Sequence, residues 1–117
     1  MIRAVLYREG ENLTGCQLNG HSGWADSGKD ICCAGASILT CTCVNSLESV
    51  CGIIPNVTQN DEGILVFELP SMTTAENEKA QILMKALKQG LTDLSTEFPQ
   101  NVTLCIKERS KERRKQP

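Results

Sequence analysis

Apolar and polar residues alternate along the first twenty residues, the spacing typical of a β-hairpin. The pattern predicts a strand over residues 2–8, a turn over 9–12 and a second, antiparallel strand over 13–19. The next ten residues, 20–29, contain three glycines and two serines. We expect them to form a loop long enough to be mobile, of the kind that often orders on a ligand.

Residues 30–51 lack proline and are rich in small apolar side chains, which predicts a helix. Asp30 is a favourable N-cap residue, and Gly52 is a natural C-terminal stop. The small residues near the start of this helix would leave room for a peptide beside it. Its expected apolar contacts are Ala34, Ala36, Ile38, Leu39, Leu47 and Val50.

A second hairpin is predicted from strands over 57–59 and 64–69, joined by the turn residues 60–63 and ended by Pro70. A helix over 74–98 follows, and Pro99 ends it. Gly90 within this helix indicates that another part of the chain approaches it closely. Residues 102–106 form the last predicted strand. The apolar positions of this second helix recur every three or four residues: Ala80, Leu83, Leu87, Leu91, Leu94 and Phe98.

The order β-β-α-β-β-α-β predicts an α+β, two-layer fold with a mixed or antiparallel sheet and two helices packed on one face. At 117 residues the chain forms one domain, able to bury about two-thirds of its unfolded surface. We assign residues 1–107 to this domain and 108–117 to a basic tail that we expect to be disordered. The open sheet of so small a domain favours dimerisation.

The charge is distributed unevenly. Residues 107–117 carry six basic and two acidic groups, whereas the whole chain has 12 basic and 14 acidic residues. The tail either makes a weak contact with RNA phosphates or is a solvated end, while the acidic body argues against a DNA-binding surface. No stretch is expected to reach the roughly 20 apolar residues that cross a bilayer, and no signal peptide is apparent. We expect a cytoplasmic protein without a membrane partner.

Seven cysteines are an odd number, and no Cys-x-x-Cys pair accompanies the single histidine. A zinc site is therefore not expected, and neither is another metal or cofactor. The cysteines expected to be reduced packing residues are Cys16, Cys41, Cys43, Cys51 and Cys105.

Two residues stand out as candidates for catalysis. His21 lies in the glycine-rich loop, and Cys33 is predicted in the first turn of the following helix, where free N–H groups and the helix dipole stabilise a thiolate. A thiolate and an imidazole are the minimum equipment of a cysteine nucleophile. The alternative is a surface histidine and a packed cysteine, and the residues alone leave both open.

The segment GHSGWADSGKDICCAGAS resembles the bacterial ribosomal-processing cysteine proteases, the Prp or YsxB-like family. The resemblance implies a homodimeric protease that trims a short N-terminal extension, hydrophobic and ending in aromatic residues, from ribosomal protein number twenty-seven of the large subunit. By position it matches His21 and Cys33 to the catalytic pair, and Gly20, Asp30 and Ser37 to the other motif positions. Cys32 and Trp24 depart from the family pattern.

Helix geometry selects between the adjacent cysteines, because successive helical residues point about 100° apart. Cys33 shares its face with Ser37, so we expect Cys33 to be the nucleophile and Cys32 a buried neighbour. Asp30 either caps the helix or orients His21, and Ser37 either hydrogen-bonds near the thiol or packs. The loop residues expected to contact substrate are Ser22, Gly23, Trp24 and Gly28.

The expected oxyanion donors are backbone N–H groups at the helix start. A rival hypothesis is a non-catalytic ribosome-assembly or peptide-binding module that binds the same extension and leaves it intact. A redox sensor built from Cys32 and Cys33 is disfavoured, since a disulfide between adjacent helical residues is strained.

Overall fold

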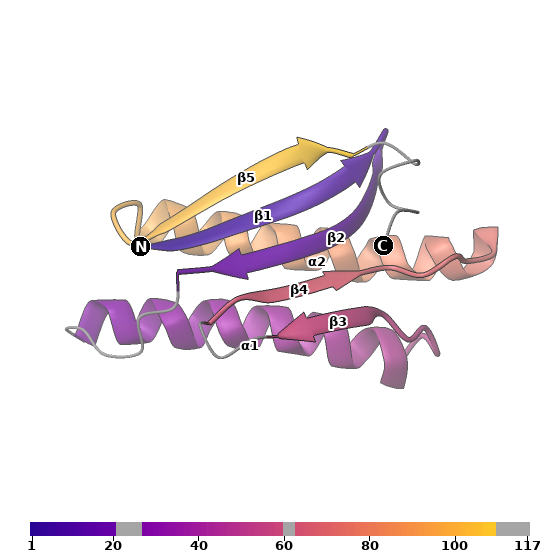
Figure 1. The fold of residues 1–117 in the computed structure, drawn as a ribbon, viewed down its shortest axis with the longest axis horizontal. Helices are drawn as coiled ribbons and strands as arrows, with labels where there is room; N and C mark the ends of the chain where they lie inside the picture. Colours follow the sequence, from indigo (N-terminus) through magenta and orange to yellow (C-terminus); the bar gives the residue numbers. More distant parts are fainter. Residues whose placement is uncertain (21–26, 60–62, 110–117) are drawn as a thin grey trace.

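The computed structural model describes residues 1–20, 27–59 and 63–109, and of residues 27–30 the helical backbone only. Its order of strands and helices is the predicted one (Figure 1). Most boundaries fall within one or two residues of those expected from the sequence; the start of the first helix is the exception. The elements are β1 (Ile2–Glu9), β2 (Asn12–Asn19), α1 (Ser27–Ser49), β3 (Asn56–Gln59), β4 (Leu65–Glu68), α2 (Thr74–Glu97) and β5 (Val102–Glu108).

The strands form one sheet in the order β3-β4-β2-β1-β5. β5 pairs in parallel with β1, and the other neighbours are antiparallel, so the sheet is mixed as predicted. Both helices cover the same face of this sheet and leave the other face open (Figure 1). The α+β two-layer prediction is therefore confirmed.

The helices run antiparallel and approach each other closely at two glycines. A Cβ atom added to Gly90 would lie 2.6 Å from Cδ2 of Leu39, and one added to Gly35 would lie 3.4 Å from Cδ1 of Leu94. A leucine side chain of the other helix thus packs against each glycine. The expectation that Gly90 marks a close approach is confirmed.

Helix α1 ends as the sequence predicts. Gly52 has a φ of 69°, its N–H donates to Glu48 C=O at 3.0 Å, and the N–H of Ile53 donates to Leu47 C=O at 2.8 Å. These two bonds form a C-capping motif around a left-handed glycine, which satisfies two of the last carbonyl groups of the helix. Ile53 and Leu47 are both buried in the core, so the motif also fixes how the chain leaves the helix.

The buried side of α1 differs in part from the expected one. Ala36 and Leu47 are buried and Leu39 is half-buried, but Ala34, Ile38 and Val50 are exposed. The reason is that α1 is apolar almost all round, so its hydrophobic pattern does not select one face. By length and composition the segment Ile31–Ser49 could also cross a membrane, which corrects the expectation that no stretch would qualify.

Helix α2 begins with a capping box. The Glu76 N–H donates to the side chain of Thr73 at 3.1 Å, and the Glu76 carboxylate accepts from the Thr73 N–H at 2.9 Å. Further along, the buried Gln81 amide both accepts from the Leu13 N–H and donates to the Leu13 C=O, each at 2.8 Å. This pair of bonds fastens the start of β2 to α2. The expected stripe is buried at Ala80, Leu87 and Leu91 and half-buried at Leu83, Leu94 and Phe98.

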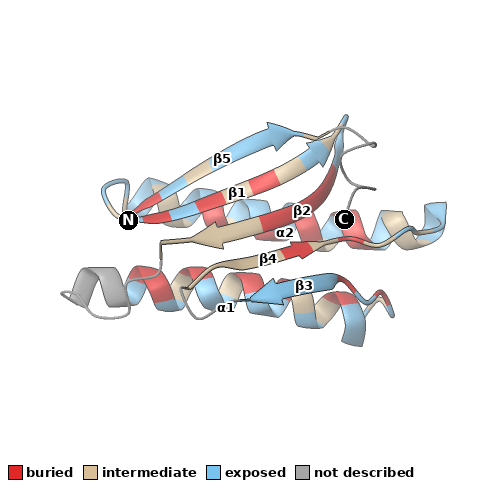
Figure 2. Cartoon of the chain, in the orientation of Figure 1, coloured by how far each residue is buried: buried red, intermediate tan, exposed pale blue. Residues whose placement is uncertain are grey.

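The core has two parts, and both lie between the sheet and the helices (Figure 2). The larger part contains Leu6, Cys16, Phe67 and Met84 among its fully buried side chains. The smaller part gathers where the N-terminal half of α1 meets the first residues of β1 and β5. Its buried members are Ile2, Cys32, Cys33, Ala36 and Val102.

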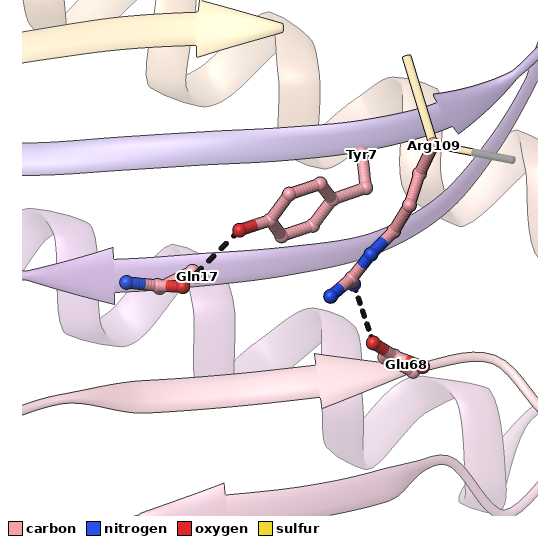
Figure 3. A network of polar contacts seen from close by, with 4 residues as sticks. All are labelled: Tyr7, Gln17, Glu68 and Arg109. Carbon is pink, nitrogen blue, oxygen red and sulfur yellow. Dashed lines mark hydrogen bonds and ion pairs between the residues drawn. The ribbon is translucent and has the colours of Figure 1, made fainter. Parts of the chain in front are cut away.

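The end of β5 is held across the open face of the sheet (Figure 3). The Arg109 guanidinium lies 4.2 Å from the centroid of the Tyr7 ring and pairs with Glu68 on β4, while the Tyr7 hydroxyl donates to Gln17 at 3.2 Å. The Arg109 N–H also donates to the Arg8 C=O at 2.8 Å. Strand β5 therefore runs to Glu108, two residues past the predicted strand end, and residues 110–117 of the expected tail lie outside the described part.

Candidate active site

Cys33 lies in the second turn of α1, because the helix starts at Ser27 and not at Asp30. The prediction of a first-turn cysteine capped by Asp30 is wrong. Ser27, Gly28 and Lys29 join the helix instead of the loop, since a single glycine costs a helix only about 1 kcal/mol. Gly28 is accordingly a helical residue and not part of a substrate-binding loop.

The earlier helix start changes the electrostatic argument. The helix dipole acts mainly within the first turn, and the N–H of a second-turn residue donates to the carbonyl four residues before it. Within the described helix the free N–H groups belong to residues 27–29, about 6–9 Å from Cys33 along the helix axis. Cys33 therefore receives less help from the dipole than a first-turn position would give.

The two adjacent cysteines lie in different surroundings. Cys32 is 0% exposed and Cys33 is 8% exposed. Burial raises the pKa of the Cys32 thiol, and the neighbouring Cys33 raises it further. Cys32 is thus a neutral packing residue, as expected, whereas Cys33 is also buried but keeps a small accessible area.

The side chains around Cys33 come from several elements. Besides the buried members of the smaller core, Leu18 of β2, Leu94 of α2 and Phe98 pack against this cluster and are half-buried. The sequence pattern identified Leu94 and Phe98 as members of an apolar stripe. It gave no sign that the antiparallel helices would bring this stripe to the Cys33 end of the sheet, which depends on tertiary structure.

Gly20 is fixed at the point where β2 ends. Its φ of 95° lies in the range that glycine tolerates, and a Cβ atom there would stand 2.0 Å from the carbonyl oxygen of Met1. Ile2, the residue after Met1, belongs to the smaller core part around Cys33, so the close approach of Gly20 to Met1 places the end of β2 beside this Cys33 cluster. Gly20 is therefore required for the path by which the chain leaves the sheet toward His21.

The structure brings some of the predicted site residues together. Gly20 and Cys33 lie at the same end of the sheet, and Ser37 lies one turn after Cys33 with an exposed side chain. The exposure of Ser37 rules out the alternative that it packs in the core. Asp30 lies within the helix, which removes its capping role. The predicted residues His21, Ser22, Gly23 and Trp24 lie outside the described part of the chain.

A separate cavity of about 600 Å³ lies at the other end of β2. The eight residues of β2 span about 23 Å, so this cavity is distant from the Cys33 end. Its polar lining residues are Glu9, Asn12, Thr14, Asn56, Glu68, Ser71, Thr73, Thr74 and Asn77.

Comparison with known proteins gives consistent results. A family model described as cysteine protease Prp matches residues 1–103. The ribosomal processing cysteine protease Prp of Bacillus subtilis is 27% identical over 105 residues, covering 87% of this chain and 94% of that protein. The protein of the same name from Staphylococcus aureus (strain Mu50) is 28% identical over 95 residues, covering 81% and 88%.

Solved structures show the same fold. The Streptococcus mutans protein SMU.848 superimposes with a TM-score of 0.85 at 32% identity, covering 93% of this chain and 96% of that one. The essential ribosomal processing protease Prp of Staphylococcus aureus, solved in complex with a substrate peptide, gives a TM-score of 0.79 at 22% identity and covers 91% and 99%. A five-stranded sheet with two helices is thus common to this chain and to both structures.

Proposed function

The chain belongs to the Prp family of cysteine proteases, and from that premise we propose that it removes the short N-terminal extension of ribosomal protein number twenty-seven of the large subunit. The nucleophile is Cys33 and the base is His21. The observation that carries the choice of nucleophile is the contrast between the adjacent thiols: Cys32 is fully enclosed in the core with a raised pKa, whereas the buried Cys33 keeps 8% of its surface accessible.

The proposed reaction is hydrolysis through a thioester. The Cys33 sulfur attacks the scissile carbonyl carbon while His21 takes up the thiol proton. The C–N bond then breaks, and His21 returns the proton to the leaving amine. Water, deprotonated by His21, attacks the thioester, which releases the new carboxylate and restores the Cys33 thiol.

The neighbouring motif residues support this chemistry. Because Asp30 does not cap the helix, its proposed role is the other one allowed by the sequence, to accept a hydrogen bond from His21 and orient the ring. Ser37 offers an exposed hydroxyl to the bound peptide. The oxyanion donors are proposed among the free N–H groups of residues 27–29.

The same proposal includes the setting of the enzyme. We infer a homodimer that works in the cytoplasm, uses no cofactor, and binds neither DNA nor a membrane. A weak contact between the basic tail and ribosomal RNA would assist substrate encounter, and it would weaken steeply with salt.

The test is to mix the purified protein with the extended ribosomal protein and measure intact masses over an hour. We expect loss of the extension with the wild type and with Cys32→Ala, and none with Cys33→Ala or His21→Ala. If the wild type binds the extended protein without cleaving it, the non-catalytic binding module is correct. Activity that disappears only in Cys32→Ala would refute the choice of nucleophile.

A further inference from the structure

The face of the sheet opposite the helices is formed by cross-strand rows of side chains. Ile2, Ala4 and Leu6 of β1 are buried against the helices, so the residues between them point to the open face. Residues paired across neighbouring strands point to the same side, and the pairing therefore gives the composition of each row. They are the Arg3 row (Thr103, Arg3 and Asn19), the Val5 row (Cys105, Val5, Gln17, Val66 and Thr58) and the Tyr7 row (Lys107, Tyr7, Gly15, Glu68 and Asn56).

The charge of this face is opposite in sign to that of the whole chain. Its rows and the Arg109 side chain above them carry three positive charges and one negative, a net +2, whereas the chain has a formal net charge of −2. Glu68, the one carboxylate in these rows, is paired with Arg109 (Figure 3). Arg3 and Lys107 are exposed and form no ion pair with any other described residue. The open face thus presents unpaired cations and no unpaired carboxylate within the described rows.

The basic tail is attached to the chain at this same face. Arg109, the last described residue, is held there by the Tyr7 ring and by Glu68. Residues 110–117 contain four basic side chains and one acidic side chain, so they add positive charge next to the open face. The sheet and the tail therefore favour the same kind of partner, one with many negative charges.

We propose that the open face of the sheet binds single-stranded RNA. This extends the RNA contact proposed above from the tail to the folded domain, and it rests on the proposed function for the choice of RNA among polyanions. Arg3 and Lys107 bind phosphate groups, and the uncharged Val5 row between them contacts bases and riboses. A flat sheet with its other face covered by helices is a common platform for single-stranded RNA.

The spacing of the rows fits a strand of RNA. Alternate residues of a β-strand lie about 6.6 Å apart, so the Arg3 row and the Tyr7 row flank the Val5 row at about that distance on either side. Val5 and Val66 are half-buried and offer small apolar contacts to bases. The Gln17 Oε1 accepts from the Tyr7 hydroxyl at 3.2 Å, which leaves the Gln17 NH2 group to donate to a base or a ribose hydroxyl.

The same residues indicate little dependence on base sequence. Sheets that read RNA sequence stack bases on exposed aromatic rings, whereas the Tyr7 ring is covered by the Arg109 guanidinium at 4.2 Å. Contacts with phosphates therefore supply most of the affinity, and the affinity should fall as salt is added.

Other partners suit this face less well. A surface that lies on a bilayer carries large exposed apolar side chains beside its cations, and the apolar members of these rows are only Val5, Val66 and Cys105. A basic protein would be repelled by Arg3 and Lys107. An acidic peptide would pair with both cations but has no bases to cover the Val5 row.

The first experiment measures the Kd of the full chain for a fluorescein-labelled oligomer of uridines by fluorescence anisotropy. Arg3→Gln combined with Lys107→Gln removes two phosphate contacts and should weaken binding roughly 10–30-fold in about 0.1 M salt. The slope of log K against log salt should become shallower by about 1.4, because each contact with a single strand contributes about 0.7.

Lys85→Gln combined with Lys88→Gln is the matched control. It also removes two exposed positive charges, but from α2, and should change the Kd by less than about twofold. Circular dichroism and thermal melting should show that both double variants remain folded, because all four positions are exposed. An equal loss of RNA affinity in the two double variants would show an effect of net charge alone and overturn the proposed surface.

A second variant separates the sheet from the tail. Its changes neutralise the basic tail residues of the full chain: Lys111→Gln, Arg113→Gln, Arg114→Gln and Lys115→Gln. This variant should bind RNA more weakly than the wild type and should lose further affinity when Arg3→Gln and Lys107→Gln are added. If the Arg3 and Lys107 changes have no effect in either background, the RNA binds the tail alone and the proposal is refuted.

Amide NMR spectra locate the RNA independently of any substitution. Adding the uridine oligomer to the full chain should shift the backbone signals of Arg3 and Lys107 and the side-chain NH2 signals of Gln17 and Asn19. The signals of α2 should stay in place. Shifts confined to the helices would contradict binding at the open face.

The outcomes separate this proposal from the proteolysis. Cleavage of the extended ribosomal protein in buffer without RNA should be the same in the wild type and in the Arg3 and Lys107 double variant. A wild type that cleaves but does not bind RNA refutes the RNA surface alone, and one that binds RNA but does not cleave refutes the proteolysis alone. Equally tight binding of polyglutamate, or of vesicles of phosphatidylglycerol and phosphatidylcholine, would overturn the choice of RNA.

Discussion

Replacing Gly20 with alanine should destabilise the protein through two effects, backbone strain and steric overlap. The φ of 95° strains any residue with a Cβ by about 1–2 kcal/mol. The new Cβ would also lie 2.0 Å from the Met1 carbonyl oxygen, a backbone atom that cannot rotate away. Overpacking of this kind typically costs about 1–3 kcal/mol.

A small opposing effect comes from the unfolded chain, which loses freedom when glycine becomes alanine and thereby stabilises the fold by about 0.4–1 kcal/mol. The net expectation is a loss of about 1–4.6 kcal/mol in the free energy of unfolding, measured by urea denaturation. A domain of this size has about 5–15 kcal/mol in total, so the variant should still fold at 25 °C. Because Ile2 would shift with Met1, the Cys33 cluster should be disturbed and peptide cleavage should fall further than stability.

Gly10→Ala is the matched control. Gly10 also has a positive φ, 62°, but an added Cβ would meet nothing within 4 Å. This variant should show the backbone strain without the steric contact, and it lies at the far end of the β1–β2 hairpin from Gly20. If the two alanine variants lose equal stability, the reasoning from the Met1 contact is refuted.

Three further predictions concern the rest of the fold. Gln81→Leu removes both hydrogen bonds to the Leu13 backbone and leaves a buried N–H and a buried C=O without partners. It should therefore lower the free energy of unfolding, measured in urea, by about 2–4 kcal/mol. A loss below about 1 kcal/mol would contradict this reasoning. Gly90→Ala should lower the free energy of unfolding of the wild type by about 1 kcal/mol, because overlap of the new Cβ with Leu39 outweighs the better helix propensity of alanine. In a Leu39→Ala background the overlap is removed, so the same change should raise the free energy of unfolding by a similar amount. Burial raises the pKa of Cys16 to about 12, so above pH 9 the thiol ionises more readily in the unfolded chain than in the folded one. The free energy of unfolding should therefore be retained below pH 9 and fall as the pH rises from 9 toward 12. In Cys16→Ala this fall should be shallower.

Much of the fold could be predicted because its signals are local. The alternation in the first twenty residues, the turn residues near Gly63, and the regular apolar spacing of α2 each specify one element without reference to the others. The end of α1 at Gly52 was likewise predictable, because helices commonly end at a residue with positive φ, which is usually glycine. The parallel β1–β5 pair, by contrast, joins opposite ends of the chain and carries no local signal.

The candidate site likewise contains residues that the sequence identified and residues that only the tertiary structure revealed. The sequence identified Gly20, Cys33 and Ser37, and their spacing carried the family resemblance. It misplaced the helix start, since Ser27 and Asp30 are both favourable near a helix N-terminus and local propensity differs little between them. The half-buried residues beside Cys33 could not be assigned to the site from the sequence, because they come from elements far apart in the chain.

The chain by itself determined the order of its elements, the buried face of α2 and the adjacent cysteines among which we expect the nucleophile. Tertiary structure alone decided how completely the two cysteines are enclosed, with Cys32 0% and Cys33 8% exposed, and that Ile38 faces outward instead of the core. The physical reason is the same in both cases. A helix that is apolar on every side can be buried along any of them, and the side that is buried depends on where the second helix and the sheet pack against it.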